Sequence, residues 1–161
     1  SLYADQNESF IFELFNSNAV ILPMENKYSV ISNFPHVPFK ETKYSETYGF
    51  NSEAYKKAND FIIEQRGYFN VDKAMKTLEL SARTNGEFKT RASIVFIPLE
   101  QKVIICFDGN YQNIWKINIT KNTIEYCDVD NIVRSTTISK HGILKSEMLR
   151  LQNEKNLSWN C

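Results

Sequence analysis

Cysteine, histidine and glycine often serve nucleophilic, metal-binding and phosphate-binding sites, and the chain contains only a few of each. Cys106, Cys127 and Cys161 are odd in number and widely spaced, which fits neither a zinc pattern nor a disulfide framework. His36 and His141 lie far apart in the chain, and the 5 glycines are scattered. The sequence therefore lacks the motifs of metal hydrolases, serine hydrolases with a nucleophile elbow, and phosphate-binding loops, and we expect no cofactor.

The composition predicts one globular domain over residues 1–161. The chain is 42% apolar and 24% charged, which suits a packed core and argues against long disorder. Its 19 Lys and Arg residues balance 19 Asp and Glu residues, so bulk charge gives no reason to expect nucleic acid as a partner. No apolar run approaches the roughly 20 residues of a membrane span, and no signal peptide is visible. We therefore expect neither a nucleic-acid nor a membrane partner, and a cytoplasmic location.

The first third of the sequence predicts a β-meander. Its second segment, Ser9–Phe15, alternates so that Ile11, Glu13 and Phe15 share one face. Asparagine-rich turns separate the segments, and two prolines mark residues 33–39 as an ordered loop. The strands expected here are Leu2–Asp5, Ser9–Phe15, Ala19–Met24 and Tyr28–Ser32.

Two helices and a second block of strands should follow. Apolar residues at helical spacing predict helices over Ser52–Arg66 and Val71–Arg83, and a short helix over Gly142–Gln152. The expected strands are Ala92–Ile97, Lys102–Phe107, Asn113–Thr120 and Thr123–Cys127. Strands in blocks with the helices grouped between them indicate the α+β class with mostly antiparallel sheets. One helix pair covers one sheet face, so the apolar strands at 92–107 need a second cover, from self-association or from the tail.

The most informative stretch is residues 2–35, LYADQNESFIFELFNSNAVILPMENKYSVISNFP. One strand ends in Ala4-Asp5, another carries Glu13, and the last delivers Ser32-Asn33 into a proline loop. Residues 90–107 then add a Thr, a Ser and an apolar strand pair. This order resembles the linear amide C–N hydrolases, the N-terminal-nucleophile (Ntn) family that contains choloylglycine hydrolases, acid-ceramidase-like amidases and penicillin acyltransferases. The resemblance covers about residues 2–120 and rests on the order and spacing of individually loose motifs.

The resemblance implies an αββα sandwich, of which this chain would be a part, and an oxyanion-hole role for Asn33. In this family the mature N-terminal Cys attacks the amide and its own α-amine is the base. An Asn at the end of a strand donates its amide to the developing oxyanion, and Asn33 is the matching residue. An Asn before Phe-Pro is also a good turn former that bonds its own backbone, so both roles for Asn33 stay open.

The resemblance also implies a substrate pocket, in which we place Phe34, Phe39 and Tyr55. Phe34 and Phe39 belong to an aromatic stretch without periodicity, as a binding loop would. Tyr55 stands at the position that we align with an arginine on the family's first helix. The chain departs from the family at this residue, and also at Ser32, where Thr is usual, and at Phe34, where a polar residue often follows.

The family's nucleophilic Cys belongs to an N-terminal half that this sequence does not contain. We therefore expect the chain to be the C-terminal part of an amidase or acyltransferase and to be inactive by itself. Its expected partners are a small-molecule amide in the parent protein, and either the N-terminal half of that protein or further copies of this chain.

Two alternatives remain open. One is a non-catalytic α+β binding or structural domain of the same fold, which the missing arginine and the altered Ser32-Asn33-Phe34 support. The other is an autonomous hydrolase with Ser1 as nucleophile, which predicts that Ser1→Ala abolishes amide cleavage and leaves the fold intact. The order of the motifs argues against this second alternative, because Leu2 begins the first strand at once.

Overall fold

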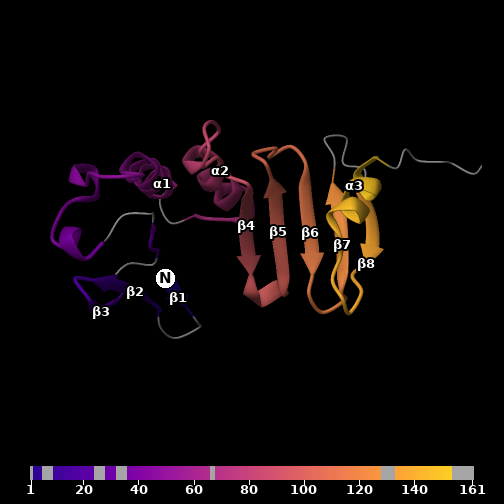
Figure 1. Ribbon diagram of the computed structural model, residues 1–161, viewed down its shortest axis with the longest axis horizontal. Coiled ribbons are helices and arrows are strands. Elements are labelled where there is room, and N and C mark those ends of the chain that lie inside the picture. The colour runs from indigo at the N-terminus through magenta and orange to yellow at the C-terminus, as the bar shows by residue number, and fades with distance from the viewer. Residues whose placement is uncertain are drawn as a thin grey trace, which may run out of the picture. The chain divides into compact units, whose positions relative to one another are not determined.

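The computed structural model describes residues 2–4, 9–23, 28–31, 36–65, 68–127 and 133–153 (Figure 1). The chain divides into two compact units, residues 1–81 and residues 82–161, and each is described by itself. Each unit contains one antiparallel sheet and at least one helix. The structure thus confirms the α+β class that the blocks of strands and helices predicted.

The first unit begins with a three-stranded antiparallel sheet in the order β1-β2-β3. Its strands are β1 (Leu2–Ala4), β2 (Ser9–Phe15) and β3 (Asn18–Pro23). Asn16 and Ser17 join β2 to β3 with φ angles of 50° and 64°, and positive φ at both central residues is the backbone of a tight hairpin turn. The asparagine turn predicted at this point is therefore present.

Strand β2 has a buried and an exposed face, as its alternation predicts. Ile11 is buried and Glu13 is partly buried, whereas Leu14 is 73% exposed. Glu13 pairs with Val20 of β3 in the hairpin register. The Glu13 side chain therefore lies on the same face of the sheet as the buried Ile11.

The strand predicted over Tyr28–Ser32 is wrong. Tyr28–Ile31 is irregular chain in the structure, and Ser32 lies outside the described residues. The residues Tyr-Ser-Val-Ile favour an extended backbone, but a strand also needs a neighbour that offers a ladder of hydrogen bonds. Strand β3, the edge strand that precedes this segment in the chain, ends at Pro23, which has no N–H to donate.

Two short turns and two helices complete the first unit. The 3-10 turns are η1 (Val37–Phe39) and η2 (Tyr44–Glu46), and the helices are α1 (Ser52–Glu64) and α2 (Val71–Ser81). The helices pack against each other as a pair, and each contributes a buried apolar residue, Ala58 from α1 and Met75 from α2. Both helices begin where the sequence predicted and end two residues earlier.

The second unit is a five-stranded antiparallel meander with one helix (Figure 1). Its elements are β4 (Ala92–Ile97), β5 (Lys102–Phe107), β6 (Ile114–Asn118), β7 (Thr123–Cys127), β8 (Val133–Thr137) and α3 (Lys145–Asn153). Strands follow one another in sequence order, so each pairs with its chain neighbour. Strand β8 was not predicted, because an edge strand with the sequence VRSTT carries almost no apolar signal.

The core of the second unit lies between the sheet and α3. Trp115, Ile124 and Tyr126 form a buried cluster with Leu151 of α3, and Met148 of the same helix packs on it. The tail helix thus supplies part of the second cover that the sheet requires. On β4, Ile94 and Phe96 remain 41% and 68% exposed, so α3 covers the β6–β7 side of the sheet more fully than the β4 side.

Among the residues that the structure describes, no helix is long and apolar enough to cross a membrane.

Candidate functional site

Two of the four predicted site residues lie in the described part of the chain, and both belong to the first unit. Phe39 ends the turn η1, and its ring meets the ring of Tyr48 edge-on with centroids 5.0 Å apart. Tyr55 lies in the first turn of α1 and makes an edge-on contact with His36, with ring centroids 5.4 Å apart. Asn33 and Phe34 lie outside the described residues, as do Ser1 and Ser32.

The Glu13 carboxylate fastens the chain that follows Asn33 to strand β2. The His36 N–H donates to Glu13 Oε2 at 2.7 Å, and the Val37 N–H donates to Glu13 Oε1 at 3.3 Å. Hydrogen bonds from backbone N–H groups to a carboxylate are charge-assisted and stronger than neutral ones. His36 is three residues beyond Asn33, so these bonds hold the first described residues after the predicted oxyanion donor. Sequence reasoning placed Glu13 in the motif but gave it no role.

The His36 side chain joins this anchor to α1. Burial lowers the pKa of the His36 imidazole, and the negative charge of Glu13 opposes that shift without cancelling it. Burial likewise raises the pKa of the Tyr55 phenol. At neutral pH the contact is therefore one between an uncharged imidazole and an uncharged phenol. The pair forms a partly apolar wall between the loop and the helix.

A second fastening holds the same loop to α1 farther along the chain. Tyr44, in η2, donates its hydroxyl to Asp60 Oδ1 of α1 at 2.7 Å, and this hydrogen bond raises the pKa of the Tyr44 phenol. Thr47 is 2% exposed and donates its hydroxyl to the Tyr44 carbonyl at 2.7 Å. The described part of the loop predicted over residues 33–39, residues 36–39, is thus ordered, and the hydrogen bonds of Tyr44 and Thr47 hold the chain that follows it. Beyond it, the aromatic side chains of Tyr48 and Phe50 are 74% and 59% exposed.

The arrangement offers two carboxylates, Glu13 and Asp60, together with neutral hydrogen-bonding rings and exposed aromatic residues, which suits binding and orientation of a substrate. Among the described residues, no group of His, Cys, Asp and Glu could hold a metal ion. Cys106 is fully buried in the second unit, where a thiol behaves as a small apolar residue. The described residues of this site can therefore contact and orient a bound molecule.

Comparison of the chain with models of protein families, with curated proteins and with solved structures found no match in any of the three.

The lowered pKa of His36 gives the first unit a characteristic dependence on pH. The unfolded chain binds a proton at the ordinary histidine pKa of 6.5, whereas the folded chain binds it only at lower pH. Unfolding therefore takes up a proton just below pH 6.5, so the free energy of unfolding should fall as the pH falls through this window. Urea denaturation between pH 7.5 and 5.5 measures the slope.

His36→Phe keeps an aromatic ring against Tyr55 and removes the titration, so this variant should lose part of that slope. His141→Gln changes an exposed histidine of the second unit and should keep the slope of the parent chain. Equal slopes for His36→Phe and the parent would show that His36 does not couple folding to pH.

Proposed function

We propose that this chain is the C-terminal part of an enzyme that hydrolyses linear amide C–N bonds or transfers their acyl groups, with the αββα sandwich of the N-terminal-nucleophile family. The observation that carries the proposal is the anchoring of the loop after Asn33. Glu13 of β2 holds the backbone of His36 and Val37, and the His36 ring packs on Tyr55 of α1.

An oxyanion donor is useful only when its position is fixed before the reaction begins. A side-chain amide that points at the developing negative charge can contribute roughly 3 kcal/mol to the stability of the transition state, and a misplacement of about 1 Å removes much of that effect. Asn33 precedes a segment that is bound to a strand on one side and to a helix on the other. Such an anchor supports the proposal that the chain around Asn33 is held in place, as an oxyanion donor requires.

The surrounding residues suit an uncharged acyl group. Phe39, Tyr48 and Tyr55 provide aromatic surface in the same unit, and burial keeps the His36 imidazole uncharged at neutral pH. We assign Phe34, Phe39 and Tyr55 to contact with the substrate. Tyr55 in place of the family's arginine would make this wall less polar, which favours an apolar acyl chain.

In the proposed reaction an upstream cysteine is exposed as the mature N-terminus. Its thiol attacks the amide carbonyl while the α-amine takes the thiol proton, and Asn33 donates to the oxyanion. Collapse of this intermediate releases the amine, which takes that proton, and leaves an acyl thioester. Water then hydrolyses the thioester, or a second amine accepts the acyl group.

The longer protein encoded by the gene provides the test. Incubation with a fatty-acyl amide, followed by acid quenching and mass spectrometry, should show an acyl adduct on an N-terminal cysteine peptide, and hydroxylamine should release it. Replacing this cysteine with Ala should lower cleavage by about 1,000-fold or more, because the nucleophile and its thioester route are lost. Cleavage without an adduct, or a longer protein without an upstream cysteine, would contradict the proposal.

A second candidate is a non-catalytic binding domain of the same fold. A specific observation favours it: the second unit contains an open cleft with apolar and amide side chains, and none of these lining residues is a cysteine or a histidine. In that case the longer protein would bind a small molecule and cleave no amide.

A further inference from the structure

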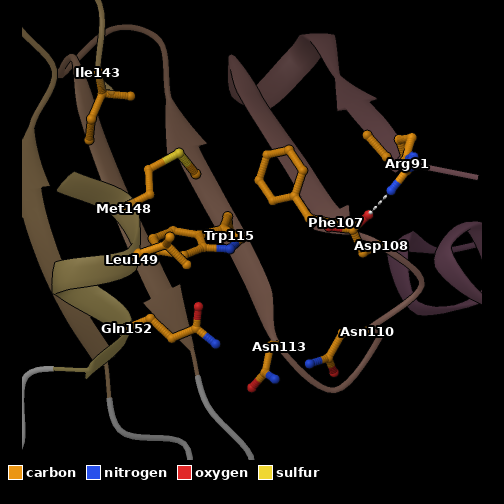
Figure 2. Close-up of a pocket in the computed structure, with 11 residues that line it drawn as sticks. Arg91, Phe107, Asp108, Asn110, Asn113, Trp115, Ile143, Met148, Leu149 and Gln152 are labelled. Atoms are coloured by element: carbon orange, nitrogen blue, oxygen red, sulfur yellow. Dashed lines mark hydrogen bonds and ion pairs between the residues drawn. The ribbon is translucent and has the colours of Figure 1, made fainter. Parts of the chain in front are cut away.

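A cleft of about 730 Å³ opens in the second unit between α3 and the β4–β5 side of the sheet (Figure 2). The volume lies within the range of about 300–1,000 Å³ that is usual for small-molecule sites. All of the residues that line it belong to the second unit, so the cleft is independent of the site around Glu13 and Asn33.

The walls of the cleft are apolar. Figure 2 shows the Phe107 ring on one side, Met148 and Ile143 on the other, and Trp115 between them at the level of Leu149. Trp115 is 4% exposed and belongs to the buried cluster, so it forms a rigid floor, whereas Phe107 is 38% exposed and offers its ring to a ligand. A flat or extended hydrocarbon body fits between these walls.

One end of the cleft is polar, and the polar groups there are carboxamides. Gln152 of α3 lies at this end on the helix side of the cleft, and Asn113 and Asn110 lie across from it (Figure 2). Asn113 Oδ1 accepts a hydrogen bond from the Tyr126 hydroxyl at 2.6 Å, which fixes the orientation of its amide. Each carboxamide carries both donors and an acceptor, so this end can pair with a group that has both.

The charged residues of the lining neutralise each other. Arg91 Nη1 lies 3.4 Å from Asp108 Oδ1, and these are the charged residues among those that line the cleft. A ligand with a net charge would lose its hydration on entering the cleft. No unpaired charge in the lining would compensate for this loss, so binding of the ion is costly. An uncharged ligand meets no such penalty.

We propose that this cleft binds an uncharged amphipathic small molecule, whose hydrocarbon body lies between Phe107 and Met148 and whose carboxamide or hydroxyl end meets Asn113 and Gln152. The proposal goes beyond the amide-bond chemistry that we propose for the longer protein and does not depend on it.

Three probes with one hydrocarbon body and different charge test the proposal: 4-phenylbutanamide, 4-phenylbutanoate and 4-phenylbutylammonium. Each is titrated into the ¹⁵N-labelled chain, and the indole N–H signal of Trp115 and the side-chain NH₂ signals of Asn113 and Gln152 are followed. We expect the neutral amide to bind at least about 10-fold more tightly than either ion, because only the ions lose hydration without compensation. Equal affinities, or no saturable shift with the amide, would overturn the proposal.

Gln152→Glu adds a negative charge at the polar end and should change the preference from the amide to the ammonium probe. Asn153→Glu adds the same charge one residue farther along α3, at an exposed position outside the lining, and should keep the preference for the amide. The two variants place the charge in the same last turn of the helix, so its effect on the helix dipole is matched. The same preference in both variants would contradict the assignment of the polar end.

Phe107→Ala tests the apolar wall and should weaken binding of the amide by about 10-fold, since it removes a ring that the ligand would cover. Phe96→Ala removes an exposed ring from the neighbouring strand, outside the lining, and should leave the affinity unchanged. An equal loss in the two variants would show that the probe binds to exposed apolar surface in general and would overturn the proposal.

Discussion

Replacing Ile124 with Ala should lower the free energy of unfolding of the second unit by about 3–4 kcal/mol, which is the usual cost of deleting a fully buried aliphatic side chain. Ile124 is 0% exposed and packs in the cluster of Trp115, Tyr126 and Leu151. The flat aromatic neighbours are held by the sheet and cannot collapse into the space. Urea denaturation followed by tryptophan fluorescence measures the loss, with Trp159→Phe as the background so that Trp115 alone reports.

Ile94→Ala provides a matched control on the same sheet. Ile94 is 41% exposed on β4, so the same chemical change should cost about 1 kcal/mol, in proportion to the apolar area that it buries. If both variants lost the same stability, the cluster beneath α3 would not be the core of this unit. A small loss for Ile124→Ala would also argue that α3 does not dock on the sheet, and the wall of the cleft would be lost with it.

Much of the second sheet could be predicted from local signals. The strands β4, β5 and β7 have the bounds that the sequence predicted, because turns lie on both sides of β5, after β4 and before β7. Gln101 and Asp108 have φ angles of 52° and 50° at the two ends of β5, where the chain reverses. Polar turn residues therefore indicate where each strand ends, and the short turns fix how neighbouring strands pair, before any long-range contact is known.

The errors have a common physical cause. Tyr28–Ile31 has the residues of a strand but pairs with no strand among the residues that the structure describes, whereas β8 has the residues of a loop and pairs with β7 along its whole length. Strand β8 forms because its backbone hydrogen-bonds to β7. This pairing sets Arg134 opposite Tyr126 and Thr136 opposite Ile124, and it requires no alternation of apolar residues. Strand formation depends on the neighbour, and a single sequence does not show which neighbour is available.

The candidate site depends on contacts between distant parts of the chain. Glu13 and His36 are separated by 23 residues, and the bond between them uses a backbone N–H, which every residue other than proline possesses. No residue type at His36 could have indicated it. The signal that could have found the anchor is Glu13 itself, an acidic residue on the buried face of an otherwise apolar strand, which requires a partner. The cleft likewise combines β4, β5 and β6 with α3, which follows them in the sequence only after β7 and β8.

In the longer protein that we propose, Asn33→Ala should lower kcat for a linear amide by about 100- to 1,000-fold with a small change in KM, because the oxyanion donor that we assign to Asn33 would act mainly on the transition state. Thermal unfolding should be little changed, which separates loss of catalysis from loss of the fold. A variant with unchanged kcat would assign Asn33 to the turn alone. The upstream cysteine would remain testable by acyl trapping in that case.

Glu13→Gln should lower kcat by about 10-fold in the same protein, because the loop after Asn33 would lose a charge-assisted anchor and hold the amide less accurately. Glu41→Gln is the matched control: its side chain is 87% exposed in the same loop, and the same change should leave kcat unaltered. The decisive readout is the imidazole of His36, followed by NMR. The charge of Glu13 raises the pKa of His36 against the effect of burial, so its removal should lower that pKa further. A lowered pKa with an unchanged kcat would show that the anchor exists but does not position Asn33, whereas a change in both would show that the partly buried Glu13 carboxylate contributes to the reaction.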